Sequence, residues 1–238
     1  MENQITFRTD MTVELVNSMA ADSDVAQAAR VSTIGKGSTV ETKGAEADAG
    51  LINYLMRDRH GSPFEHNAFT FFIEAPIFVF REFMRHRIAS YNEESGRYKQ
   101  LGPVFYVPGP SRNLVQVGKP GAYEFVEGGE GLTIKTQTAL IRNSEDSYEK
   151  YLALIDQGVA REVARMALPV NIYSSMYVTM NARSLMNFLS LRTKDETSAY
   201  PSFPQREIEM VAEKMEEFFA EKMPLTYESF KKNGRVAP

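Results

Sequence analysis

The stretch NAFTFFIEAPIFVFREFM (Asn67–Met84) decides the fold class, because a strand pattern passes directly into a helix pattern within it. Its first half is rich in aromatic residues, which favour the pleated, half-buried surface of a β-strand. Pro76 then suits the first turn of a helix. The apolar residues that follow share one helical stripe: Ile77, Phe80, Phe83 and Met84. Arg81 and Arg85, four residues apart, are expected to project together from the same helix.

The alternation of the two patterns continues along the chain. Periodicity predicts helices over 45–60, 133–158, 160–168, 181–192 and 204–223, and strands over 104–110 and 171–180. Gly158 is the expected stop of the long helix. This order predicts an α/β fold of the α+β type, with a mixed, largely antiparallel sheet flanked by helices. We expect one domain over 1–238, in which 32–50 is a mobile loop and 228–238 a tail.

The composition limits the classes of protein. The 238 residues carry a formal net charge of −4, which argues against nucleic acid as a partner. The chain has no cysteine, so disulfides, thiolate metal sites and cysteine nucleophiles are excluded. The apolar runs are too short to cross a bilayer, and the polar start MENQITFRTD does not resemble a signal peptide. We therefore expect a cytoplasmic protein with no membrane partner.

Metal chemistry is not predicted. His60, Glu65 and His66 lie within HGSPFEH, but their spacing matches neither a helical H-x-x-x-H pair nor a zinc finger. Hydrogen-bonded structural histidines at the entrance of a strand are the more frequent outcome for such a cluster, so we assign no metal.

Serine catalysis and glycine-rich phosphate loops are also unsupported. Ser90 and Ser95 lie near His86 in the sequence, but no G-x-S-x-G elbow surrounds either serine. GKGSTVETKG (35–44) lacks the G-x-x-x-x-G-K-[ST] spacing of a phosphate loop, and no strand is followed by G-x-G-x-x-G. If a dinucleotide binds here, other groups must hold its phosphates.

Arginines are the remaining candidates for binding an anion. They gather in three apolar segments: Arg81, Arg85, Arg87, Arg97, Arg161, Arg165, Arg183 and Arg192. Guanidinium groups bind phosphate in a bidentate manner and stack on planar rings. A lone arginine is usually a solvated surface residue, but a cluster of this size among core-forming residues favours a polyanionic ligand.

The helix expected over 181–192 places amides beside these arginines. Asn181 and Arg192 are eleven residues apart, close to three turns, and Arg183 and Asn187 are four apart. Amides with guanidiniums supply both donors and acceptors for a heterocycle. From the residues alone, the chain is an enzyme or a binding protein for a phosphorylated, ring-containing ligand.

The stretch RHRIASYNEESGR (Arg85–Arg97) resembles the R-H-R-x7-S signature of the flavin-dependent thymidylate synthases. Arg85, His86 and Arg87 supply RHR, and Ser95 is the serine. The resemblance extends in order and spacing through AARVS, HGSPFEHNAFTFFIEAPIFVFREFMRHR and VAREVARMALPVNIYSSMYVTMNARSLMNFLSLR to the C-terminal helix. It covers most of the chain.

The resemblance implies an activity, cofactors and an assembly. Members of this family are homotetramers whose active sites combine several subunits. They convert dUMP to dTMP with 5,10-methylenetetrahydrofolate as carbon donor and FAD, reduced by NADPH, as the hydride source. The lack of cysteine agrees with this family, because the non-flavin synthases need a cysteine nucleophile.

The resemblance also implies site residues. The dUMP site comprises Glu82, Arg85, Glu93, Glu94, Ser95, Gly96, Arg97 and Arg165. The FAD site comprises Ser32, Ser62, Glu65, Arg85, His86, Arg87, Ile88, Asn92, Glu93, Asn181, Arg183, Asn187 and Arg192. Arg192 is the catalytic residue, expected to stabilise negative charge that develops on the pyrimidine. Ser95 has no adjacent base, so we expect a phosphate ligand there rather than a nucleophile.

Two departures from the family pattern affect these expectations. Glu82 stands where the family often has glutamine, which alters a contact to the uracil edge. The segment 193–206 is longer than usual and lacks a histidine commonly found beside the flavin; Tyr200 or Phe203 is the candidate to cover the ring instead. Two alternatives stay open: a non-catalytic nucleotide- or RNA-binding protein, and a homologue that binds FAD and oxidises NADPH without methylating.

Overall fold

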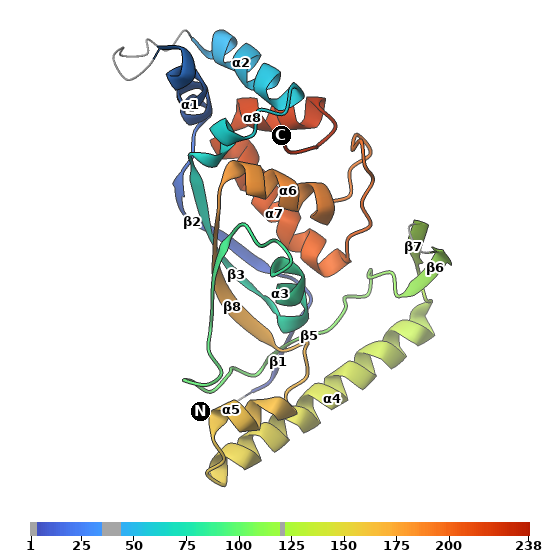
Figure 1. Cartoon of the computed structure of the whole chain (residues 1–238). Coiled ribbons are helices and arrows are strands. Elements are labelled where there is room, and N and C mark those ends of the chain that lie inside the picture. The colour runs from blue at the N-terminus through green and yellow to red at the C-terminus, as the bar shows by residue number, and fades with distance from the viewer. Residues whose placement is uncertain (1–3, 35–43, 120–121) are drawn as a thin grey trace. The chain divides into compact units, whose positions relative to one another are not determined.

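The computed structural model describes residues 4–34, 44–119 and 122–238. In chain order the elements are β1 (Thr6–Arg8), β2 (Thr12–Met19), α1 (Asp22–Ile34), α2 (Ala45–Arg57), η2 (Ser62–Glu65), β3 (Ala68–Pro76), α3 (Ile77–Phe83), β4 (Ser90–Glu93), β5 (Val104–Tyr106), β6 (Val115–Lys119), β7 (Ala122–Val126), α4 (Glu130–Asp156), α5 (Arg161–Ala164), η3 (Arg165–Ala167), β8 (Tyr173–Met180), α6 (Ala182–Arg192), α7 (Arg206–Lys222) and α8 (Pro224–Lys232) (Figure 1).

These elements form two compact units that interleave along the chain. Unit 1 is built from Met1–Thr12, Glu74–Phe83 and Glu93–Met176. Unit 2 is built from Val13–Ile73, Met84–Asn92 and Tyr177–Pro238. Strands β3 and β8 run through both units, so no point in the sequence separates an N-terminal from a C-terminal domain.

The sheets are mixed, as the sequence predicts. Four strands follow the order β2-β3-β8-β4. β1 pairs with β5 in parallel, and β6 pairs with β7 in antiparallel register. Helices accompany these strands, so the α/β class is confirmed. None of the helices that the structure describes is both long enough and apolar enough to cross a membrane.

Unit 1 is organised around the long helix α4. Tyr148 and Tyr151 of α4 are buried with Phe105 of β5 and Ile172, which precedes β8. Both tyrosine hydroxyls bond to the backbone of Leu101, so their burial leaves no polar group unsatisfied. Helix α4 ends before Gly158, whose φ of +83° is easily reached only by glycine. The expected stop is confirmed.

Unit 2 packs α7 on one face of β3. The ring of Phe69 lies edge-on to Phe219 of α7 at 6.0 Å, and the ring of Phe71 lies 6.2 Å from Phe218. Alternate residues along a strand point to opposite faces, which is why the aromatic residues at odd positions of β3 are buried. The predicted strand and its half-buried character are confirmed.

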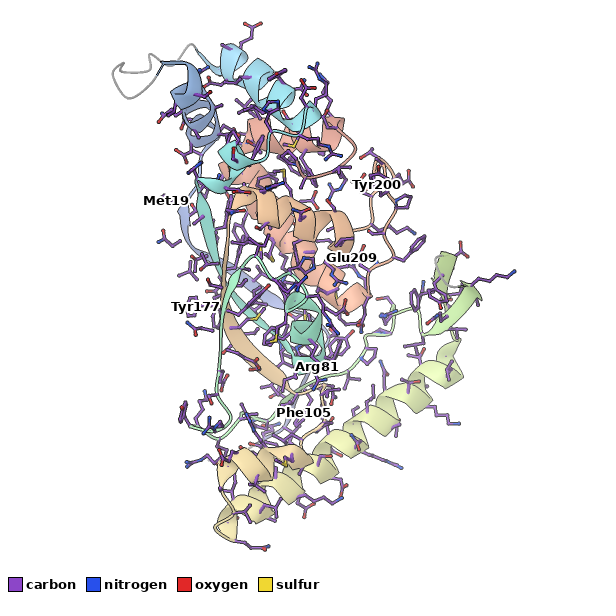
Figure 2. All side chains as sticks on the ribbon, in the orientation of Figure 1. Met19, Arg81, Phe105, Tyr177, Tyr200 and Glu209 are labelled. Atoms are coloured by element: carbon purple, nitrogen blue, oxygen red, sulfur yellow. The ribbon has the colours of Figure 1, made fainter. Side chains whose placement is uncertain are left out.

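The opposite face of the unit 2 sheet carries half-exposed and exposed side chains. Phe72 of β3 lies 5.7 Å from Tyr177 of β8, and the hydroxyls of Thr70 and Thr179 bond across the same strands. Tyr177 is 48% exposed and Met19 of β2 is 69% exposed. Figure 2 shows both side chains on the side of the sheet away from α6 and α7.

The helices α1, α2 and α8 form a second layer of unit 2. Arg30 of α1 donates to Asp48 of α2 at 2.6 Å, and both side chains are nearly buried. The carboxylate of Asp22 in α1 accepts the N–H groups of Leu225 and Thr226 at 2.9 and 2.8 Å. These N–H groups lack partners within the first turn of α8, so Asp22 serves as its N-terminal cap from about 200 residues away.

Three expectations about elements are wrong. The expected loop 32–50 is helical at both ends, because α1 reaches Ile34 and α2 begins at Ala45; residues 35–43 lie outside the described residues. The expected tail 228–238 includes most of α8, and its Arg235 is buried. Helix α3 ends at Phe83, so Met84 is not part of the core stripe and is 46% exposed.

Other elements were not anticipated. Ser90–Glu93 forms β4, a strand that the sequence did not predict. Sequence reasoning also missed β1, β2, α1, α8 and the hairpin β6-β7. No side chain of β1, β2 or β6 is fully buried, so these strands lack the alternation of buried and exposed residues that reveals a strand.

Candidate active site

The predicted site residues fall into two groups that follow the division into units. The nucleotide group lies in unit 1 and contains Glu82, Glu93, Glu94, Ser95, Gly96, Arg97 and Arg165. The flavin group lies in unit 2 and contains Ser32, Ser62, Glu65, Arg85, His86, Arg87, Ile88, Asn92, Asn181, Arg183, Asn187 and Arg192. Arg85, predicted for both ligands, belongs to unit 2, and Glu93 belongs to unit 1.

A tight turn builds the nucleotide group. The Ser95 hydroxyl oxygen accepts the N–H of Arg97 at 3.3 Å, and the Ser95 carbonyl accepts the N–H groups of Tyr98 and Lys99. Gly96 is buried, and a Cβ there would lie 3.3 Å from Cδ of Arg165. The lack of a side chain at position 96 therefore lets the turn approach the Arg165 stem.

Carboxylates already neutralise the cations of this turn. Arg97 donates to Glu162 at 3.0 Å, and both side chains are more than half exposed. Glu94 accepts from Ser175 at 3.1 Å and pairs with Lys99 at 2.7 Å. Glu94 thus holds the turn against β8. Arg97 makes an exposed ion pair, in which an incoming phosphate can replace Glu162.

Two further carboxyl groups belong to the nucleotide group. Partial removal from water raises the pKa of Glu93 above its ordinary value, and the positive charge of Arg165 opposes that shift. Glu82 lies in the last turn of α3 and is half buried. The α3 helix ends one residue later, so Arg81 and Arg85 do not share the continuous helical face that the sequence predicts.

The segment after α3 carries the flavin group's signature residues. Arg85 and Arg87 are exposed, and Ile88 is 75% exposed. His86 differs from them because its backbone carbonyl accepts the hydroxyl of Tyr91 at 2.7 Å. The expectation that Arg85 lies on the same helix as Arg81 is wrong, because α3 ends at Phe83 and Arg85 to Arg87 belong to the irregular connection between α3 and β4.

His86 contacts the predicted catalytic arginine. Arg192 Nε donates to His86 Nε2 at 3.1 Å, and the imidazole lies edge-on to Phe188 with ring centroids 4.9 Å apart. Burial, together with the smaller effect of the nearby charge of Arg192, lowers the pKa of His86 to about 4. The imidazole is therefore neutral near pH 7.

Asn181 and Arg183 begin α6 and tie it to neighbouring segments. Asn181 is the N-cap of the helix, and its side-chain oxygen accepts the N–H of Ser184 at 2.9 Å. Arg183 pairs with Glu65 at 2.5 Å. A Cβ at Gly61 would lie 2.6 Å from the Arg183 guanidinium, so Gly61 permits this position. Sequence reasoning did not identify Gly61.

The remaining predicted flavin residues are open to solvent. Asn187 is exposed and donates to the Arg183 carbonyl at 3.2 Å, which confirms their spacing on α6. Ser62 starts η2 and is exposed, and Ser32 of α1 is exposed as well. Asn92 is exposed on β4.

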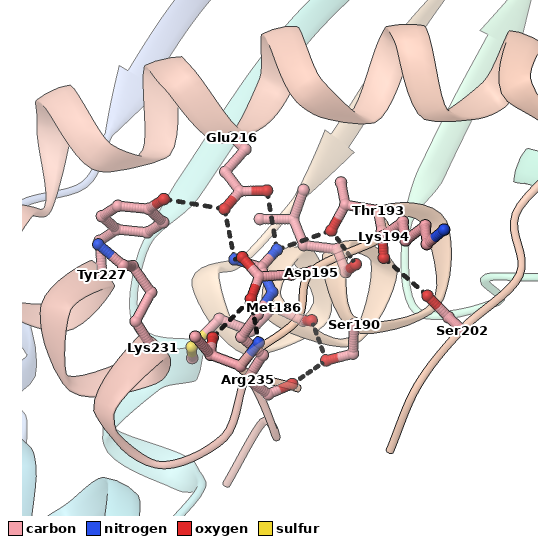
Figure 3. Close-up of polar contacts among 12 residues, drawn as sticks. Met186, Ser190, Thr193, Lys194, Asp195, Ser202, Glu216, Tyr227, Lys231 and Arg235 are labelled. Atoms are coloured by element: carbon pink, nitrogen blue, oxygen red, sulfur yellow. Dashed lines mark hydrogen bonds and ion pairs between the residues drawn. The ribbon is translucent and has the colours of Figure 1, made fainter. Parts of the chain in front are cut away.

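A buried ion-pair network supports the end of α6, as Figure 3 shows. The guanidinium of Arg235, 2% exposed, donates to Glu216 at 2.6 and 2.8 Å and to Thr193 Oγ1 at 2.7 Å. The Arg235 carbonyl accepts the Ser190 hydroxyl at 2.6 Å. These bonds hold the residues on both sides of Arg192. The sequence gives no signal of them, because the partners are distant along the chain.

The segment between α6 and α7 is held by hydrogen bonds to the backbone, and its two aromatic side chains are exposed. Ser202 donates to the Thr193 carbonyl at 2.7 Å, and the Ala199 N–H donates to the Gly234 carbonyl at 2.9 Å. Tyr200 is 74% exposed and Phe203 is 48% exposed (Figure 2). Neither ring is used by the core, so both are accessible to a ligand.

The donor set of unit 2 fits an anionic dinucleotide such as FAD. Arg85, Arg87 and Arg183 offer guanidinium groups to phosphates, and Asn92 and Asn187 offer amides to a heterocycle. All of these except Arg183 are exposed. Among the described residues, no cluster of three or more histidine, aspartate or glutamate side chains is arranged to hold a metal ion.

Comparison with known proteins agrees with this arrangement. The sequence model of the family described as "Thymidylate synthase complementing protein" matches residues 14–225. A flavin-dependent thymidylate synthase from Streptomyces avermitilis is 64% identical, over 98% of this chain and 95% of its own. One from Thermotoga neapolitana is 44% identical, over 92% of this chain and 89% of its own.

Solved structures are equally similar. The UMP/dUMP methylase PolB from Streptomyces cacaoi, bound with 5-Br dUMP, superimposes with a TM-score of 0.94 at 53% identity. That match covers 98% of this chain and all of the other. The same protein bound with 5-Br UMP gives a TM-score of 0.90 at 51% identity, over 98% of this chain and 99% of the other.

Proposed function

The chain belongs to the family of flavin-dependent thymidylate synthases, and from that membership we propose how its residues divide the work of methylating dUMP. It is an enzyme of the transferase class that requires a flavin. The proposed reaction is reductive methylation of dUMP to dTMP. 5,10-Methylenetetrahydrofolate is the proposed carbon donor, and NADPH the proposed reductant of FAD.

The turn of unit 1 is proposed to bind the phosphate of dUMP. A phosphate dianion accepts hydrogen bonds from hydroxyl, amide and guanidinium groups, which Ser95, the Gly96 backbone, Arg97 and Arg165 supply. Ser95 acts as a ligand, because its hydroxyl lies in a turn where it accepts a backbone N–H. The phosphate replaces Glu162 as the partner of Arg97, so the positive charge on Arg97 stays neutralised in both states.

Arg192 is proposed to act on the pyrimidine. Methyl transfer to C5 requires electron density in the ring, and negative charge develops on the N3–O4 edge as the ring is activated. A guanidinium remains protonated at every working pH, so it stabilises that charge without moving a proton. The site restrains Arg192 directly through His86, and restrains the neighbouring Thr193 through the bond from Arg235 to its hydroxyl.

The exposed donors of unit 2 are proposed to hold FAD. Arg85, Arg87 and Arg183 face its phosphates, and Asn92 and Asn187 face its ring system. When bound, the flavin supplies the hydride that turns the transferred one-carbon unit into a methyl group. The protein's own task is to bind and orient these groups and to keep the charge of Arg192 in place.

A homotetramer with shared active sites is proposed as the working assembly. The support comes from the unit 2 sheet, whose face opposite α7 exposes Met19 and Tyr177 beside Phe72. Apolar side chains gathered on one sheet face are typical of surfaces buried between subunits. The two groups of site residues belong to different units, which leaves each group available to complete a site with another subunit.

The observation that supports the proposal most directly is the contact between His86 and Arg192. It brings the predicted catalytic arginine to the signature segment, although the two residues are 106 positions apart. Neither an arginine-rich RNA-binding surface nor a solvated arginine requires this pairing. The net charge of −4 also favours a small nucleotide over a nucleic acid.

The decisive assay measures dTMP formation by the purified protein from dUMP, methylenetetrahydrofolate, FAD and NADPH, with each component omitted in turn. We expect a flavin absorbance spectrum and product only in the complete mixture. Replacing Arg192 by Met is expected to reduce product formation to a small but measurable residual rate while flavin binding persists. Replacing Arg57, an exposed residue that pairs with the neighbouring Asp58, by Gln is the control and should leave activity unchanged.

UMP is a second candidate substrate, because the similar solved structures described above are those of a UMP/dUMP methylase and include a UMP analogue. The same assay run with UMP separates the two nucleotides. NADPH oxidation without a methylated product from either nucleotide would refute the proposed methylation. A colourless protein that FAD cannot reconstitute would refute the enzyme assignment altogether.

A further inference from the structure

His86 is held by three contacts from separate parts of unit 2, one to its backbone and two to its side chain. The hydroxyl of Tyr91 in β4 donates to the backbone carbonyl of His86 at 2.7 Å, and Phe188 of α6 packs edge-on against the imidazole ring. Arg192, one turn further along α6 than Phe188, donates Nε–H to its Nε2 at 3.1 Å. The backbone, the ring plane and one ring nitrogen are thus each fixed by a different residue.

The direction of the hydrogen bond determines the state of the imidazole. Arginine nitrogens only donate, so Nε2 of His86 must accept and carries no proton. The ring proton of the neutral form therefore lies on Nδ1. Protonating the imidazole would remove the acceptor and place a second positive charge beside Arg192. Burial and the Arg192 charge keep the pKa of His86 at about 4, in agreement with this geometry.

The same bond determines how Arg192 meets a ligand. Nε carries a single hydrogen, and His86 accepts it, so a bound pyrimidine must be contacted through the terminal Nη groups. The guanidinium is planar, and fixing its Nε edge also limits the plane in which both Nη groups lie. An apolar residue at position 86 would remove this restraint on the plane of the guanidinium.

We propose that His86 is a positioning residue for Arg192, which it orients through an Nε2 acceptor in the Nδ1–H tautomer. This inference rests on the proposed catalytic function of Arg192 and assigns to the signature histidine a task other than contacting FAD. It predicts that the side chain at position 86 must be long enough to place a hydrogen-bond acceptor beside the Nε–H group of Arg192. Aromaticity and a titratable proton are not required there.

The first test compares His86→Leu, His86→Gln and the control His60→Leu in the dTMP assay. His60 is exposed, and its ring rests on Tyr54. Misplacing a catalytic group by about 1 Å costs on the order of a hundredfold, so we expect His86→Leu to lower kcat by about 10- to 100-fold. KM for dUMP should change far less, because ground-state binding is untouched. His86→Gln, whose amide oxygen can accept Nε–H, should recover most of the loss.

The second test is a double-variant cycle with Arg192→Met. If His86 acts through Arg192, adding His86→Leu to the Arg192→Met protein causes no further loss. If the two losses multiply, His86 works independently, for instance on the flavin, and the inference is wrong. Equal losses for His86→Leu and His86→Gln would overturn it as well.

A third measurement is independent of turnover. In the flavin-free protein labelled with ¹⁵N at histidine and arginine, His86 should show an unprotonated Nε2 and a protonated Nδ1. The Arg192 Nε–H resonance should shift in His86→Leu and remain near its position in His86→Gln. The opposite tautomer overturns the inference whatever the activity. Full activity of Arg192→Met with the expected tautomer would instead refute the proposed catalytic role of Arg192.

Discussion

The neutral His86 makes a quantitative prediction about acid stability. Its pKa is about 4 in the folded chain, against 6.5 as the ordinary value. The unfolded chain therefore binds a proton at this histidine between these two values and the folded chain does not. The free energy of unfolding falls as the pH falls through this window. Above pH 6.5 both states are neutral and His86 causes no change.

The size of the effect follows from the shift. A difference of about 2.5 pKa units corresponds to about 3 kcal/mol when the pH is below both values. At pH 5 most unfolded chains carry this proton and few folded chains do. The free energy of unfolding is therefore about 2 kcal/mol lower at pH 5 than at pH 8. Other groups also titrate in this range, so the effect must be isolated by comparison with His86→Gln, which cannot protonate.

Urea denaturation of the flavin-free protein, followed by circular dichroism at fixed protein concentration, measures this difference. We expect the free energy of unfolding of the unaltered protein to decline more steeply than that of His86→Gln. The gap between the two proteins should change by about 2 kcal/mol between pH 8 and pH 5. Parallel curves, or a gap of the opposite sign, would show that His86 is charged or unconstrained in the fold.

Other substitutions test the remaining features. Glu162→Gln removes the carboxylate that competes with phosphate, so KM for dUMP should fall by about twofold to fivefold at low salt, with a smaller change at high salt; an increase in KM would mean that Glu162 supports binding. Gly61→Ala displaces the flexible end of Arg183, so isothermal titration should show weaker FAD binding at an unchanged melting temperature. Arg235→Met removes the cation that faces the nearly buried carboxylate of Glu216 and should lower the free energy of unfolding by about 3–5 kcal/mol. Arg206→Met, which breaks a more exposed pair, should cost less than about 1 kcal/mol; equal losses would contradict the burial argument.

Local patterns predicted the elements whose burial repeats with a regular period. The aromatic alternation of β3 and the long amphipathic α4 are examples: β3 buries alternate side chains along its length, and α4 buries Ser144, Tyr148 and Tyr151 on one side of its second half. The end of α3 could not be predicted, since Met84 continues the apolar spacing after the helix has stopped. A hydrophobic side chain at the right interval does not reveal that the backbone has already turned away.

The sequence predicted candidate site residues but not the contacts among them. The structure places two of these candidates, His86 and Arg192, against each other. The supporting residues Gly61, Glu216 and Arg235 escaped sequence reasoning. Their roles depend on partners far along the chain, and no spacing rule links positions that only the tertiary fold brings together.

The capping of α8 by Asp22 has a consequence for synthesis on the ribosome. The acceptor is translated 204 residues before Thr226, its donor. At a translation rate of about 5–20 residues per second, α1 waits about 10–40 s before its partner exists. During that interval the apolar side of α1, including Val25 and Ala26, lacks α8 as cover. The nascent chain should therefore depend on chaperones until its last helix is released, and its yield should be sensitive to translation speed.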